Sequence, residues 1–134
     1  MLLLALLTAC GPRDDGGAAP GAASGTATSS RPGDASGISV VTAVEPLRVG
    51  PTTVTAQVSD GAGPLVGADV SVRGDMTHAG MPPALGALQE GPPGSYATDA
   101  FELPMAGDWI ITVEATTADG REASFESFVS VGAR

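Results

Sequence analysis

The sequence predicts an all-β domain, an antiparallel sandwich of short strands, and three observations point to it. Glycine (19) and proline (11) are abundant among the 134 residues, which favours turns and short strands over long helices. From residue 38 onward, apolar and polar residues alternate with a period of two, as in strands that bury one face. The same part of the sequence lacks the 3.6-residue apolar period of an amphipathic helix.

Seven segments carry the strand pattern. In residues 53–59, for example, Val54, Ala56 and Val58 fall on one face and polar residues on the other. Trp109 begins the most apolar segment and is the expected core anchor. We expect strands at residues 38–44, 53–59, 68–73, 84–89 (a short edge strand), 95–103, 109–115 and 121–131, with a loop at 74–83. Six to seven short strands within residues 38–131 predict an immunoglobulin-like antiparallel β-sandwich.

The first nine residues have the composition of an export signal. The run MLLLALLTA is too short to span a membrane, which takes about 20 apolar residues, but it fits the apolar core and cleavage region of a signal segment. The sequence LTAC at residues 7–10 resembles a lipobox, the motif that lipoprotein signal peptidase cuts. The resemblance implies lipid on the Cys10 sulfur and a fatty acyl group, such as palmitate, on its new amino terminus. We therefore expect a bacterial lipoprotein held by Cys10 on the outer side of a membrane, in the periplasm or on the outer face.

Residues 10–36 are expected to be a disordered linker between the lipidated cysteine and the folded domain at 37–131. Residues 11–36 contain no Ile, Leu, Val or aromatic residue, so they cannot bury enough apolar surface to offset their chain entropy. The domain carries the acidic excess of the chain, with twelve Asp and Glu against three Arg in residues 37–131. Such a surface repels phosphate groups, which excludes nucleic acid as an expected partner.

The loop at 74–83 is the segment most suited to chemistry. It contains Met76, Met81 and His78, which is the only histidine of the chain. The third methionine of the domain is Met105, which lies just ahead of the Trp109 strand. Thioether sulfur suits Cu(I), and imidazole also binds copper. Met76, His78 and Met81 are spaced so that one loop can bring them together. Met105 joins them only if the two connections lie at the same end of the sandwich.

Two other interpretations of these residues stay open. Methionine fills irregular gaps in cores, and Met76 continues the inward phase of Val70 and Val72; a lone histidine is more often structural. The acids offer oxygen ligands for Ca²⁺, although they match no calcium-loop spacing; they are Asp69, Asp75, Asp99 and Glu102.

Four motifs in order resemble the YtkA-like domain, a relative of the FixH family. They are PLVGADV at 64–70, MTHAGMP at 76–82, PGSY at 93–96 and LPMAGDW at 103–109. The resemblance implies an immunoglobulin-like sandwich outside the cytoplasm and an association with copper handling and the assembly of haem-copper oxidases. The Met-rich stretch of the family falls on Met76, His78 and Met81, and its Gly-x-Trp turn falls on Gly107 and Trp109.

Two functions from different classes follow. The first is a tethered module that binds or passes Cu(I) through Met76, His78, Met81 and Met105. The second is a metal-free interaction module that docks on an envelope or oxidase-assembly complex, with the Met-Pro loop as an apolar contact. An enzyme is not expected, because lipid consumes the Cys10 thiol and His78 has no adjacent serine-rich turn to supply a nucleophile.

Overall fold

The structure is a computed structural model that describes residues 27–31, 37–78 and 80–133. Within these ranges every regular element is a β-strand. The strands are β1 (Ala27–Arg31), β2 (Ser39–Glu45), β3 (Gly50–Asp60), β4 (Gly63–Pro64), β5 (Asp69–Met76), β6 (Ala84–Glu90), β7 (Ser95–Leu103), β8 (Gly107–Thr116) and β9 (Glu122–Val131). Among the described residues, no helix has the length and apolarity needed to cross a membrane.

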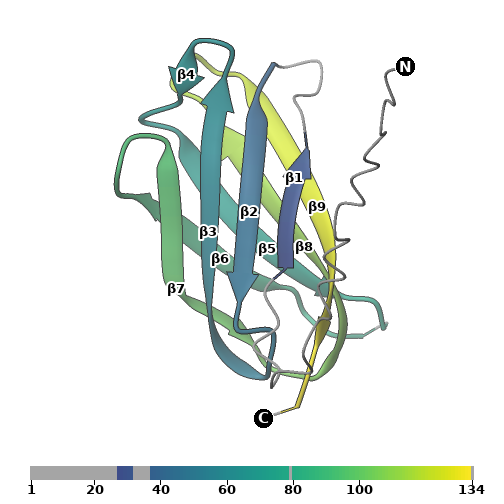
Figure 1. Ribbon diagram of the computed structural model, residues 1–134. Helices are drawn as coiled ribbons and strands as arrows, with labels where there is room; N and C mark the ends of the chain where they lie inside the picture. The colour runs from purple at the N-terminus through teal and green to yellow at the C-terminus, as the bar shows by residue number, and fades with distance from the viewer. Residues whose placement is uncertain (1–26, 32–36, 79, 134) are drawn as a thin grey trace, which may run out of the picture.

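The strands form two facing layers (Figure 1). They follow the order β1-β2-β3-β7-β6-β5-β8-β9, with β4 paired to β3, and neighbouring strands run antiparallel. One layer contains β1, β2, β3 and β7, and the other contains β6, β5, β8 and β9. The predicted all-β antiparallel sandwich is confirmed, and each of the seven predicted strands has a counterpart.

The strand β6 connects the two layers, so its prediction as an edge strand is wrong. It pairs with β5 from Val70–Leu88 to Gly74–Ala84 and with β7 through Gln89 and Glu90. Alternation of side chains reports which face of a strand is buried, but it does not report how many neighbours the backbone has. On the opposite side the layers meet at residue 132: Val49 N donates to Gly132 O, and Gly132 N donates to Leu47 O, both at 3.0 Å. The sandwich is therefore nearly closed.

The strand β1 lies within the segment predicted to be a disordered linker. Residues 27–31 pair with β2 in register from Ala27–Val44 to Arg31–Val40, which corrects the prediction at this point. A strand can add to an open sheet edge through backbone hydrogen bonds alone, so a segment without large apolar residues can still pair. The signal segment and the rest of the linker, including Cys10, lie outside the described residues.

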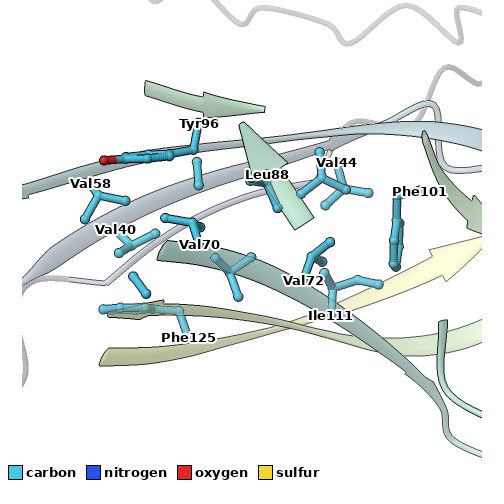
Figure 2. Close-up of a cluster of buried hydrophobic side chains, with 14 of the residues drawn as sticks. Val40, Val44, Val58, Val70, Val72, Leu88, Tyr96, Phe101, Ile111 and Phe125 are labelled. Carbon is cyan, nitrogen blue, oxygen red and sulfur yellow. The ribbon is translucent and has the colours of Figure 1, made fainter. Parts of the chain in front are cut away.

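The core fills the space between the layers (Figure 2). Trp109, Tyr96 and Phe101 are its three largest fully buried side chains. The predicted inward face of residues 53–59 is confirmed, since Val54, Ala56 and Val58 are all buried. Burial of Trp109 confirms its expected role as the core anchor.

Candidate functional site

The strand β5 extends further than predicted and carries Met76 into the sheet. Gly74 through Met76 were expected in a loop, but Gly74 pairs with Ile111 and Met76 pairs with Trp109 at the start of β8. The inward-facing positions of β5 continue past Val72 because Gly74 leaves room for the Phe101 ring. A Cβ on Gly74 would lie 3.0 Å from Phe101 Cζ. The connection between β5 and β6 therefore begins at Thr77, whose N–H donates to Asp108 O at 3.0 Å.

Met76 has a packing role at this end of the core. Its side chain is half-buried and packs against the core cluster. Its Cε lies 2.7 Å from the point where a Cβ on Gly107 would be, so the methyl group occupies the space that glycine leaves. Gly107 also has a φ of 139°, a backbone conformation that residues with a Cβ rarely adopt.

The other three predicted ligands are exposed. His78 is exposed, and Met81 and Met105 keep 38% and 45% of their surface accessible. Met81 lies between Gly80, with a φ of 99°, and the Pro82-Pro83 pair that leads into β6. Exposure leaves these side chains able to reach a ligand from solvent.

Two hydrogen bonds hold the connections that carry these residues at one end of the sandwich. Thr77 follows β5 and bonds to Asp108 near the start of β8. Trp109 Nε1 donates to the carbonyl of Met105 at 3.1 Å. This hydrogen bond fixes the connection between β7 and β8 beside the buried Trp109 ring. The condition for Met105 to join His78 and Met81 is therefore met at the level of topology (Figure 1).

The acidic residues do not assemble an oxygen-ligand site in the described part of the chain. Asp75 is held by Arg73 through two contacts, of 2.6 and 2.8 Å, and this hydrogen bonding lowers the pKa of the Asp75 carboxyl. Asp69 begins β5 and Asp75 lies near its end, while Asp99 and Glu102 lie on β7 in the other layer. Among the described residues no group of three or more His, Cys, Asp and Glu could hold a metal ion.

The far end of the sandwich carries a charged network that the sequence did not reveal. Arg121 contacts Asp60 at 3.0 Å and Asp119 at 2.9 Å, and the Thr117 hydroxyl also bonds to Asp119. The hydrogen bond from Arg121 lowers the pKa of Asp60, and the bond from Thr117 lowers that of Asp119. The network joins the end of β3 to the β8–β9 turn, a link across 61 positions that local pattern cannot predict.

A second feature, Phe128, left a signal in the sequence. Val129 and Val131 follow the buried phase of β9, whereas Phe128 stands next to Val129 and points the other way with 76% of its surface exposed. Two large apolar residues in succession break the period of two, and this break identifies the outward aromatic residue.

Comparison with known proteins places the chain in a family. The family model described as YtkA-like matches residues 34–114, more than half of the chain. No curated protein and no solved structure matches the chain in these comparisons. The matched span covers β2 to most of β8 and includes both connections that carry the methionines. The chain therefore belongs to the YtkA-like family.

Proposed function

We propose that the protein is a membrane-tethered, extracytoplasmic domain that binds or passes Cu(I) at the end of the sandwich formed by the β5–β6 and β7–β8 connections. One observation carries the proposal: His78, Met81 and Met105 are exposed on these two connections, each of which is hydrogen-bonded to the start of β8 at Asp108 or Trp109. Two thioethers and one imidazole form a soft donor set that suits Cu(I). Such a set also persists outside the cytoplasm, where thiols oxidise.

The scaffold supports this donor set by holding both connections at their bases. Met105 is fixed through its carbonyl to the indole of the fully buried Trp109. Pro82 and Pro83 have restricted φ angles, which limits the conformations that follow Met81. The formal charge of −9 raises the local concentration of a cation near the surface.

Met76 is the member of the predicted set with a competing role. Its half-buried side chain fills the space over Gly107, and this packing would be lost if the residue turned towards solvent. We therefore propose His78, Met81 and Met105 as the principal ligands and Met76 as support beneath them.

Competition titration with a Cu(I) chelator tests the proposal. We expect a dissociation constant below about 1 μM, and a loss of at least about tenfold in His78→Ala, Met81→Leu and Met105→Leu. Met76→Leu is the matched control, because it removes a sulfur and keeps a similar apolar volume, and its affinity should stay within about twofold of the parent. Absence of binding, or equal affinity in all four variants, would reject the copper site.

The tether is the second part of the proposal and rests on the lipobox-like sequence at residues 7–10. Mass spectrometry of the protein from bacterial membranes should find an N-terminal Cys10 bearing diacylglycerol and an acyl chain. A mature protein that begins at an unmodified Met1 would contradict it. The same lipid consumes the only thiol of the chain, and we accordingly propose no enzymatic role.

A metal-free docking module remains the alternative from a different class. Exposed Met81 and Met105 favour it, because flexible, polarisable methionine side chains also suit apolar contacts between proteins. The copper titration separates the two functions, since docking alone predicts no Cu(I) affinity.

A further inference from the structure

The outward face of the β5-β8-β9 sheet carries six of the twelve carboxylates in residues 37–131. Six carboxylates point away from the core on these three strands, and we call this surface the acidic face: Asp69, Asp75, Asp108, Glu114, Glu122 and Glu126. Within these strands Arg73 is the one basic residue, and it is engaged by Asp75. The register places Glu114 beside Ser71 and Ser124, and Glu126 beside Thr112, so neither carboxylate has a basic partner directly across the sheet.

The outer surface of the other layer differs in charge. On β2, β3 and β7 the exposed acids are Glu45, Asp99 and Glu102, while Asp60 is paired with Arg121 across the end of the sandwich. Most other outward positions of β3 are small and uncharged, such as Thr53 and Thr55. The outer face of β5, β8 and β9 therefore carries six carboxylates, against three exposed carboxylates on the outer face of β2, β3 and β7.

Large apolar side chains lie within the acidic face. Phe128 is 76% exposed and stands directly opposite the half-buried Ile110 on β8. Leu85, on the adjoining β6, is 70% exposed and stands opposite Arg73. An exposed aromatic residue framed by charged groups is typical of a protein contact site, where it supplies the buried anchor.

We propose that the acidic face docks a protein partner whose surface presents lysine and arginine side chains around an apolar contact. Charge complementarity selects this occupant. A second copy of the chain would bring six carboxylates against six, and anionic lipid or nucleic acid would meet the same repulsion.

The acidic face ends beside the candidate copper site. Thr77, Asp108, Phe128 and Ser130 line one shallow hollow, and Thr77 immediately precedes His78. A partner seated on Phe128 would lie against the same end of the sandwich, as transfer of a bound ion would require. The docking inference itself does not depend on the copper proposal, because its residues contribute no ligand.

Binding of a short amphipathic peptide of lysine and leucine to the metal-free protein tests the proposal. Titration followed by amide NMR should give saturable shifts on the outward positions of β8 and β9. Phe128→Ser should weaken binding by about tenfold, while oligolysine of equal charge should bind less tightly and be insensitive to that change. The exposed position of Phe128 keeps the variant folded, which an unchanged thermal transition would verify.

Matched charge variants locate the surface. The double variant Glu114→Gln/Glu126→Gln should weaken peptide binding and reduce its salt dependence, whereas Asp99→Asn/Glu102→Gln removes the same charge from the other layer and should have a smaller effect. Equal losses in both double variants, shifts centred on β2 and β3, or no peptide binding would overturn the proposal. Sedimentation showing a dimer that Phe128→Ser abolishes would also overturn it, in favour of a second copy. His78→Ala should bind the peptide as the parent does, which separates this result from any failure of the copper site.

Discussion

At the scale of single residues, Tyr96 explains two of the motifs by which the family resemblance was identified. Its hydroxyl lies 2.8 Å from Leu65 O and accepts from Ala68 N at 3.0 Å, and Glu90 Oε2 lies 3.1 Å away. A tyrosine hydroxyl is ordinarily protonated at neutral pH and can donate, and burial raises the pKa of the Tyr96 phenol further. Residues of the motifs at 64–70 and 93–96 therefore meet at one corner, and their shared role is structural.

Removal of this hydroxyl should destabilise the fold. Tyr96→Phe keeps the ring but leaves the part-buried Leu65 carbonyl and Ala68 N–H without this partner, so we expect a loss of about 1–3 kcal/mol in the free energy of unfolding. Urea unfolding measures it. Glu90→Gln is the control, because the tyrosine and both backbone contacts remain, and it should cost less. A change below about 0.5 kcal/mol in Tyr96→Phe would show that the corner adds little.

At the scale of elements, glycines set how closely β5 and β6 approach the aromatic core. A Cβ on Gly74 would lie 3.0 Å from Phe101 Cζ and 3.3 Å from Ile111 Cδ1, and one on Gly86 would lie 3.1 Å from Val72 Cγ1. Both glycines lie inside strands, where alanine would otherwise be preferred for its lower entropy cost. Their presence is explained by packing against Phe101, which also allows β5 to continue to Met76.

Gly74→Ala should therefore overpack the core, with a loss of about 1–3 kcal/mol in unfolding free energy. Gly61→Ala is a matched control, because a Cβ there meets nothing within 4 Å and its φ is not positive. The control should change stability by less than about 0.5 kcal/mol. If thermal or urea unfolding finds equal effects, the close approach to Phe101 does not limit the sheet.

At the scale of the whole molecule, the two ends of the sandwich have different chemistry. One end is closed by the Asp60–Arg121–Asp119 network and the Tyr96 corner. The other end exposes His78, Met81 and Met105 on connections anchored to β8. Charged and hydrogen-bonded groups thus tie the strands together at the first end, whereas imidazole and thioether side chains are exposed to solvent at the second.

The sequence predicted the parts of this fold that depend on side-chain period. Alternation located the buried faces, as with Val54 and Val58, and composition identified Trp109 as the anchor. It could not predict that β6 has two neighbours or that residues 27–31 pair with β2, because both follow from backbone hydrogen bonds. At the candidate site it gave the residue set, whereas the packing of Met76 over Gly107 depends on a contact across 31 positions of the chain.

Methyl-selective NMR of the protein labelled with ¹³C-methyl methionine tests the proposed copper site most directly. Each methionine gives one methyl signal, which Met76→Leu, Met81→Leu and Met105→Leu assign. With one equivalent of Cu(I) under reducing conditions, the Met81 and Met105 methyl signals should shift together while that of Met76, held over Gly107, stays close to its original position. Unchanged Met81 and Met105 signals at saturating Cu(I) would contradict the proposed site.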